Sequence, residues 1–384
     1  TSTLMFNVNS GVNATVSEAT LVLKRDEADA LRDRLSSMIF HKEVTVEEDR
    51  EIETLVEVSN LDIILHATLA QPTYQAIFGL VMLVYAILSL FQENSGGFLS
   101  AVVLFAITEA IPFIQVILKY ANYRLYRVGD TVTVESGLLS TSRRSFRTNK
   151  VNSVRVREPM LARIIGKATL DAEVVGLAGG EGVPILCPLK KKAVVEDLAN
   201  KLVPELVFEP EPEHQPARAI YPMIITDAVV SVISIAIGVW LFLNVNSRPD
   251  VNSFAETLLL LVEALFIVGI PLYRFGGSLL HQRQRMFAMG TESFMFVSGA
   301  FDMSTEYVSF DKVQIAAVRA GPLQRRFGLA TCRVSQLSSV GFRSVESGLF
   351  PPEDLEAVPD EVMARIRDGR YDYRRYLRWY RTCL

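Results

Sequence analysis

The chain has 384 residues, of which 49% are hydrophobic and 21% are charged, and its mean hydropathy is +0.25. Its net charge of −4 argues against a general nucleic-acid binder. The three cysteines are widely spaced and have no histidine nearby, which argues against a disulfide framework and a structural metal site. The apolar residues gather in four blocks of about 20 residues each, and this distribution predicts a membrane protein.

Residues 1–40 are predicted to be the second half of a soluble module that occurs in full twice further along the chain. A closing helix is expected over Asp26–Met38, and because the first half of the module is missing, we interpret this copy as truncated. Residues 41–71 are predicted to form a linker and a juxtamembrane helix, with an amphipathic stretch at Asn60–Leu69. Two dipeptides support the partial copy at a spacing of 166: Thr3-Leu4 recurs as Thr169-Leu170, and Leu23-Lys24 as Leu189-Lys190.

Residues 72–118 are predicted to form a transmembrane hairpin. The blocks Pro72–Phe91 and Phe98–Leu118 are each long enough to cross about 30 Å of hydrocarbon. Residues 119–203 are then predicted to form a complete soluble module, a small antiparallel barrel or sandwich capped by one helix. Its strands are expected at Asp130–Ser136, Leu138–Phe146, Val151–Arg157, Ala168–Val175 and Val183–Cys187, with a short helical turn at Met160–Ile165, a glycine-rich turn at Gly176–Gly182 and a closing helix at Ala193–Leu202.

Residues 204–221 are predicted to be an acidic, proline-rich linker, and a second transmembrane hairpin follows at 222–275. Its two apolar blocks are Pro222–Leu243 and Phe254–Tyr273. The short connections inside the two hairpins contain one basic residue between them, whereas seven flank the other ends. The positive-inside bias therefore places the soluble parts in the cytoplasm. The flanking residues are Lys119, Arg124, Arg127, Arg218, Arg274, Arg283 and Arg285.

Residues 276–350 are predicted to repeat the soluble module. Ser136–Thr169 aligns with Ser298–Thr331 at a spacing of 162 without a gap, and 12 of the 34 positions are identical. The repeating unit is therefore a membrane hairpin followed by a soluble module. Residues 351–384 form an arginine- and tyrosine-rich tail, which is interpreted as an interfacial anchor in preference to a nucleic-acid arm.

The order of these motifs resembles the bacterial pleckstrin-homology-like (bPH2) multi-pass membrane proteins, a family formerly catalogued as a domain of unknown function. The resemblance implies a membrane α plus cytoplasmic α+β fold, in which two transmembrane helical hairpins alternate with pleckstrin-homology-like antiparallel β-barrels, each closed by a C-terminal helix. It also implies a role in the bacterial envelope. The matching residues are Tyr126, Asp130–Gly137, Lys150, Val151, Val154, Leu161, Arg163 and Gly166, and in the second copy Gly299, Lys312, Val313, Leu323, Arg325 and Gly328.

A basic cluster in the first complete module is the leading candidate site, for an anionic lipid or an acidic partner. It consists of Arg143, Arg144, Arg147 and Lys150, and a module tethered to a membrane faces anionic head groups. The equivalent positions of the second module are Thr305, Glu306, Ser309 and Lys312, so the positive charge is largely absent there. We interpret the two copies as one scaffold with two different surfaces. A solvated strand face without a ligand is the alternative.

Three acidic residues inside the predicted spans, Glu109, Asp227 and Glu263, are the second candidate site. Ionised carboxylates are costly in hydrocarbon, so they usually face a partner or water. A proton or cation path would use them, but with four spans and no second intramembrane charge to form a relay, carboxyls that join helices are the preferred interpretation.

No catalytic or nucleotide-binding motif is present, so the chain is predicted not to be an enzyme and to need no cofactor or metal. The predicted function is a non-catalytic lipid- or protein-binding scaffold at the inner face of a bacterial plasma membrane. Its expected partners are membrane lipids and a membrane or cytoplasmic protein, not nucleic acid. The alternative is a small transporter or channel component that uses the intramembrane carboxylates.

Overall fold

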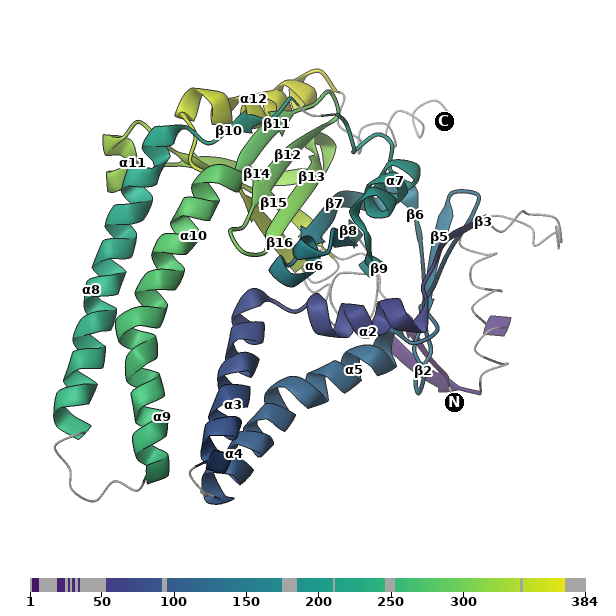
Figure 1. The fold of residues 1–384 in the computed structure, drawn as a ribbon. Helices are drawn as coiled ribbons and strands as arrows, with labels where there is room; N and C mark the ends of the chain where they lie inside the picture. The colour runs from purple at the N-terminus through teal and green to yellow at the C-terminus, as the bar shows by residue number, and fades with distance from the viewer. Residues whose placement is uncertain are drawn as a thin grey trace, which may run out of the picture.

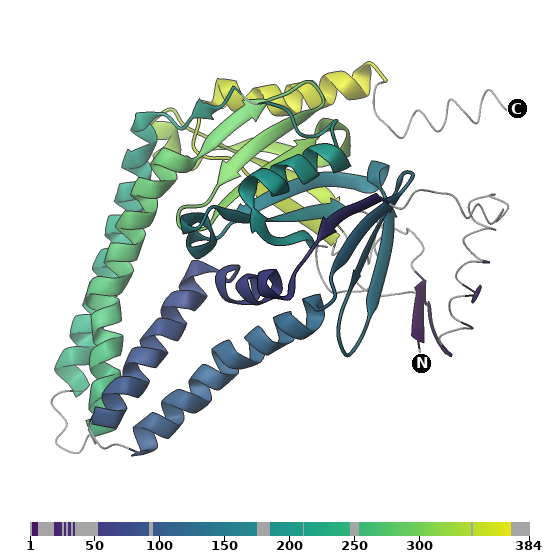
Figure 2. The ribbon, with the colours of Figure 1, turned by 45° about the vertical axis from the view of Figure 1, so that its right-hand side comes forward.

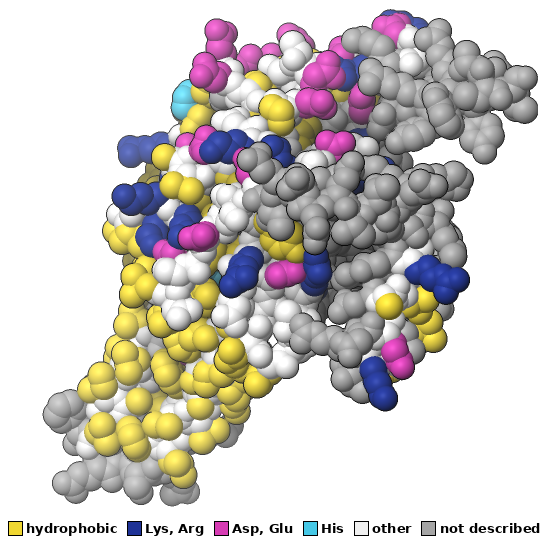
Figure 3. Space-filling model, turned by 90° about the vertical axis from the view of Figure 1, so that its right-hand side faces the viewer, with side chains coloured by type: hydrophobic (Ala, Val, Ile, Leu, Met, Phe, Trp, Pro, Cys, Tyr) yellow, Lys and Arg dark blue, Asp and Glu magenta, His cyan; other side chains and the backbone are white. Residues whose placement is uncertain are grey.

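The computed structural model shows two helical hairpins that extend from the same side of a pair of β-rich modules (Figures 1 and 2). It describes residues 2–6, 19–24, 27, 30–31, 34, 53–91, 95–174, 185–209, 211–245, 253–338 and 341–369. The first module comprises β3 to β9 with α7, and the second comprises β10 to β16 with α12. Figure 3 shows hydrophobic side chains over the hairpins, whereas charged side chains gather over the modules.

In the part of the chain that the structure describes, three helices are long and apolar enough to cross a membrane, at Phe98–Tyr120, Ala217–Asn244 and Leu259–Gln284. A fourth apolar helix, α3, meets the same test only together with the juxtamembrane helix α2, from which it is bent by 83°. The helices are α2 (Asn60–Leu69), α3 (Thr73–Phe91), α4 (Ser95–Phe105), α5 (Ile111–Tyr120), α8 (Ile220–Val245), α9 (Ser253–Ala264) and α10 (Ile270–Gln284).

Both hairpins contain one wide π-helical turn in their second helix. The turns are η1 (Ala106–Ala110) between α4 and α5, and η4 (Leu265–Gly269) between α9 and α10. Each is followed by a proline in the next helical turn, Pro112 or Pro271. Proline cannot donate a backbone hydrogen bond and crowds the carbonyl four residues earlier, so a locally widened helix accommodates it.

The first module packs two antiparallel sheets against each other, with α7 over their shared core. Leu125 and Val132 come from one sheet, Val154 and Leu170 from the other, and all are buried with Leu198 of α7. The predicted alternation of apolar residues locates β5, β7 and β8, whereas β6 begins at Ser142 and not at Leu138, and β3 and β4 were not predicted. The elements are β3 (Glu53–Glu57), β4 (Arg124–Val128), β5 (Thr131–Ser136), β6 (Ser142–Arg147), η2 (Thr148–Lys150), β7 (Val151–Glu158), α6 (Met160–Ile164), β8 (Lys167–Val174), β9 (Ile185–Lys191) and α7 (Lys192–Leu202).

The second module repeats this plan around a core richer in phenylalanine. Phe294, Phe296, Phe310 and Phe350 are fully buried there with Leu355 of α12. The elements are β10 (Glu213–His214), η3 (Ala217–Ala219), β11 (Met286–Met289), β12 (Ser293–Ser298), β13 (Met303–Ser309), η5 (Phe310–Lys312), β14 (Val313–Arg319), α11 (Pro322–Arg326), β15 (Thr331–Ser338), β16 (Gly341–Glu346) and α12 (Pro352–Arg367).

Each apolar helical hairpin is inserted between the first two strands of a module. β3 and β4 are antiparallel neighbours that flank the first hairpin, and β10 and β11 flank the second in the same way. The stretches predicted as linkers before the hairpins therefore also contribute a strand to the following module. Both ends of each hairpin are fixed by one sheet, which couples the helices to the module.

The predicted closed barrels are not found among the described residues. β13 of the second module pairs with β7 of the first, and this joins two sheets into one of seven strands in the order β10-β11-β12-β13-β7-β8-β9. The remaining sheets are β3-β4-β5-β6 and β14-β15-β16. The edge of β7 that would close a barrel with β6 is taken by β13 instead, so the modules are open sandwiches joined side by side.

Asp302, in the turn between β12 and β13, joins the second module to the first hairpin. Its carboxylate accepts hydrogen bonds from the backbone N–H and the hydroxyl of Thr73, at 2.9 and 2.5 Å, at the start of α3. It also accepts from the backbone N–H of Met160 at 3.2 Å, at the start of α6. The turn depends on Gly299, whose φ of +100° suits glycine, and where a Cβ would collide with the backbone of Asp302.

The N-terminal partial copy is described only as an antiparallel pair, β1 (Ser2–Phe6) and β2 (Ala19–Leu23). These strands correspond in the predicted alignment to β8 and β9. The closing helix predicted at Asp26–Met38 lies largely outside the described residues. The glycine-rich turn and the tail beyond Gly369 lie outside them entirely.

Candidate functional site

The predicted basic cluster lies on β6, an edge strand of the sheet β3-β4-β5-β6, and on the short helix after it. Strand alternation divides the cluster: Arg143 and Arg147 are exposed on one face, and Arg144 points to the other face, beside the buried Val134. Arg143 already forms an ion pair with Glu135 on the neighbouring strand, at 2.9 Å. Lys150 is exposed on η2.

Asp227 has a cationic partner within the second hairpin. Its carboxylate lies 2.6 Å from Nη2 of Arg274 and accepts a hydrogen bond from the Ser278 hydroxyl. Arg274 was expected to flank the span, but α10 continues to Gln284 and carries this arginine within the helix. Asp227 therefore joins α8 to α10 through this ion pair.

Glu109 and Glu263 lie apart from that pair on two different hairpins. Each has one carboxylate oxygen that is buried and has no hydrogen-bond partner among the described residues. Glu109 packs against Gly79 of α3, where an added Cβ would lie 2.9 Å from its carboxyl carbon. Small residues allow such close helix contacts in membranes.

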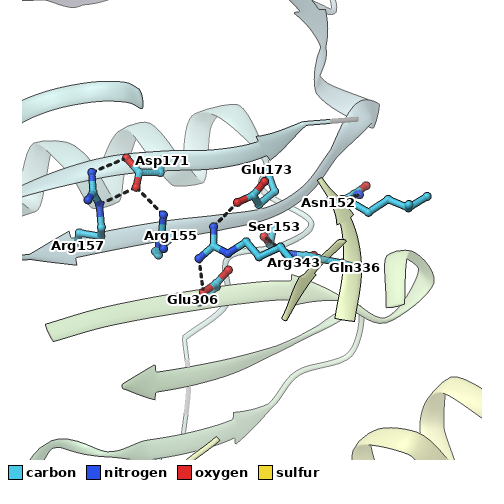
Figure 4. A network of polar contacts seen from close by, with 10 residues as sticks. Asn152, Ser153, Arg155, Arg157, Asp171, Glu173, Glu306, Gln336 and Arg343 are labelled. Atoms are coloured by element: carbon cyan, nitrogen blue, oxygen red, sulfur yellow. Dashed lines mark hydrogen bonds and ion pairs between the residues drawn. The ribbon is translucent and has the colours of Figure 1, made fainter. Parts of the chain in front are cut away.

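A buried network of charged residues occupies the junction between the two modules (Figure 4). Arg343 of β16 forms ion pairs with Glu173 of β8 and, at 3.2 Å, with Glu306 of β13. Arg155 of β7 lies directly across from Glu306 in the β13–β7 strand pair. It forms an ion pair with Asp171 at 3.0 Å. Strands from two sheets, the seven-stranded sheet and β14-β15-β16, therefore meet through one set of paired charges.

The network corrects one interpretation of the repeat. Glu306 occupies the position of Arg144 in the other copy, and this charge reversal was interpreted as a difference between two surfaces. Glu306 is instead 5% exposed, and burial raises the pKa of its carboxyl, an effect that Arg343 and Arg155 oppose. Although burial alone would lower the pKa of Arg343, Glu306 and Glu173 raise it above its usual value.

Two amides extend the junction beside the charges. Gln336 of β15 donates to the hydroxyl of Ser153 at 2.6 Å, and Asn152 donates to the carbonyl of Leu337 at 2.7 Å. These contacts join the sheet β14-β15-β16 to β7 of the other module. Buried polar groups that are paired in this way fix one arrangement of the elements that carry them.

A cavity of about 890 Å³ lies between the second hairpin and the second module, and we call it the α10 cavity. Arg155, Glu306 and Arg343 of the junction line it on one side. α8 and α10 line it on another, and α11 and β16 complete it. The cavity therefore lies where the apolar helices meet the modules.

One face of α10 supplies most of the cavity's basic groups. Arg274, Ser278, His281 and Arg285 all line it, and their spacing of four, three and four residues places them on one side of the helix. This spacing is visible in the sequence, where Arg274 and Arg285 were assigned only to orientation. The acidic lining residues come from other elements, which could not be predicted from local sequence.

No group of three histidine, cysteine, aspartate or glutamate side chains within the described ranges could hold a metal ion. The family model for the bacterial PH domain, bPH_2, matches residues 76–204 and 228–366, more than half of the chain. The chain therefore belongs to this family, and the predicted resemblance is confirmed. No curated protein and no solved structure matches it.

Proposed function

We propose that the protein is a non-catalytic multi-pass membrane scaffold, whose two PH-like modules form one platform at the cytoplasmic face of a bacterial membrane. The observation that carries this proposal is the β13–β7 pairing, which joins both modules into one sheet. The second support is Asp302, which connects that platform to the first hairpin. A platform tied to both hairpins suits the presentation of fixed binding surfaces.

The β6 edge is our proposed surface for a protein partner. β13, its counterpart in the second module, is hydrogen-bonded on both sides, by β12 and β7. β6 pairs with β5 alone among the described strands. Because an open strand edge can accept a further strand, an extended segment can add to the sheet there.

Charge indicates which segment would fit the β6 edge. In the second module Glu306 lies opposite Arg155 across the β13–β7 pair. Arg144 stands at the equivalent position of β6, so the sign of the charge at this position of the strand is reversed. We therefore propose an acidic partner segment, with a carboxylate where β7 carries its arginine.

Crosslinking and pull-down from native membranes test this proposal. Arg144→Glu is expected to reduce recovery of crosslinked protein partners strongly, because it places a like charge against an acidic segment. Arg319→Glu is the matched control, since Arg319 is exposed on β14, an edge strand of the other module. Equal recovery with the wild type and both variants would contradict a partner site on β6.

The transporter alternative is favoured by one observation, the buried unpartnered carboxylate oxygens of Glu109 and Glu263. Glu109→Gln combined with Glu263→Gln should leave partner recovery unchanged if the protein is a scaffold. Complementation of a deletion strain separates the two functions. Loss of complementation with normal expression and normal partner recovery would support transport.

A further inference from the structure

Among the described residues, every charged side chain that lines the α10 cavity has an ion-pair partner except Arg285, and Arg155 is paired with Asp171. Asp227 is held by Arg274, and Glu306 by Arg343. Glu346 is bound by Arg333 from outside the cavity lining. Among the described residues, no hydrogen bond or ion pair engages the side chain of Arg285.

Arg285 is unusually placed for a cation that forms no ion pair within the described ranges. It is partly buried, its Nε is completely enclosed, and it lies directly after the last residue of α10. Burial lowers its pKa below the usual value, and Glu346 partly opposes this effect. Arginine nevertheless keeps its proton in proteins, so the site holds a desolvated positive charge that an anion would stabilise.

His281, one turn earlier on the same face, adds a second open polar atom. Its Nδ1 is buried without a hydrogen-bond partner in the part of the chain that the structure describes. Ser344 and Ser347 also line the cavity, but their hydroxyls are already hydrogen-bonded, to Ser335 and to the backbone of Cys332 and Gly348. The groups left for a ligand are therefore the guanidinium of Arg285 and the imidazole of His281, and a planar guanidinium is well suited to phosphate.

The position of the cavity indicates the source of the phosphate. α10 belongs to the apolar helix Leu259–Gln284, so Arg285 lies at the end of a candidate membrane span. Tyr273, which lines the cavity, stacks on Phe301 of the β12–β13 turn at 4.9 Å. Phospholipid head groups lie at the level where a span meets its soluble domain, and basic pockets there bind anionic head groups.

We propose that the α10 cavity binds the phosphate of an anionic phospholipid head group, with Arg285 as its main ligand and His281 beside it. This inference rests on the proposed membrane scaffold and gives it a lipid ligand distinct from the β6 edge. The head group enters between the hairpin and the second module, and its acyl chains remain along the apolar helices. A free phosphate compound would bind to the same donors but would lack the contacts between acyl chains and the apolar helices.

Native mass spectrometry of the full chain, titrated with phosphatidylglycerol or phosphatidylcholine, tests the proposal. The wild type is expected to prefer phosphatidylglycerol about tenfold, because phosphatidylcholine carries the same phosphate together with a choline cation that Arg285 repels. Arg285→Gln is expected to lose this preference. Arg283→Gln is the matched control, because Arg283 is exposed on the same helix end and lies outside the cavity lining.

Additional measurements distinguish a folding defect from a loss of lipid binding, and lipid binding from the binding of a free phosphate compound. Arg285→Lys keeps the charge and should retain part of the preference, with thermal unfolding in phosphatidylcholine nanodiscs confirming that each variant is folded. Glycerol 3-phosphate should bind far more weakly than phosphatidylglycerol, and equal binding would overturn the lipid assignment. Equal losses in Arg285→Gln and Arg283→Gln would overturn the site. Either failure leaves the partner recovery at β6 unaffected, so the scaffold proposal stands or falls separately.

Discussion

β6 and β13 occupy the same place in two copies of one module, yet one is an edge strand and the other lies inside a sheet. β13 has β12 on one side and β7 on the other, and its Glu306 is buried in a charge network. β6 has β5 on one side, and two of its arginines are exposed. The comparison teaches that two equivalent strands have different surroundings: β13 is paired on both sides within the chain, and β6 has one neighbour among the described strands and is the edge that we propose for a partner.

The charge network makes the paired copy sensitive to a single substitution. Arg343→Ala leaves Glu173 and Glu306 buried without their shared counter-ion, so we expect a loss of about 3–5 kcal/mol in the free energy of unfolding. Denaturant unfolding in detergent measures it. Arg333→Ala is the control, because Arg333 pairs with Glu346 at a site where both side chains are about half exposed. That pair should contribute no more than about 1 kcal/mol, and equal effects of the two variants would contradict a buried junction.

Substitution of Asp302 should lower the free energy of unfolding by a smaller amount. Its carboxylate accepts hydrogen bonds at the first turns of two helices and forms no buried ion pair among the described residues. Its counterpart in the first module is Ser140, which makes the two turns different. Asp302→Ala removes the acceptor for Thr73 and Met160, and we expect a loss of about 1–2 kcal/mol. Hydrogen exchange should accelerate at the first turns of α3 and α6. Unchanged exchange at both turns would show that the second module does not hold the first hairpin.

The cores of the two modules should protect their cysteines from thiol reagents to a similar degree, although the edge strands of the modules differ. Burial raises the pKa of the Cys187 thiol to about 12 and that of Cys332 to about 11, so neither should react with maleimide at neutral pH. In a Cys383→Ser background, the folded protein should label very slowly at both cysteines. Fast labelling of the native protein would contradict closed cores, and labelling of Arg343→Ala would report which module opens first.

Much of the fold could be predicted because its signals are local. Alternating valines in Val151–Arg157 placed β7, and the stretch Asn60–Leu69 forms α2. The family followed from the spacing of short motifs, and the family model confirms it. The short strands β3 and β10 were not predicted, because they precede the membrane hairpins and carry no repeat signal.

The junction could not be predicted because it depends on pairing between distant segments. Nothing in the sequence near Arg155 indicates that Glu306 lies opposite, or that Arg343 completes the network. The reversal from Arg144 to Glu306 was visible, but only burial distinguishes a structural charge from a surface one. The α10 cavity could be predicted only in part for the same reason. The basic residues on one face of α10 are close in sequence, but the acidic residues that line the cavity come from other elements.

Hydrogen exchange along β6 and β13, measured on the full chain in phosphatidylcholine nanodiscs, tests the central claim most directly. The claim predicts slow exchange at amides along all of β13, which β12 and β7 both cover, and fast exchange at every second amide of β6. Addition of an acidic partner should then slow β6 alone. Equal protection of the two strands in the isolated protein would contradict the account.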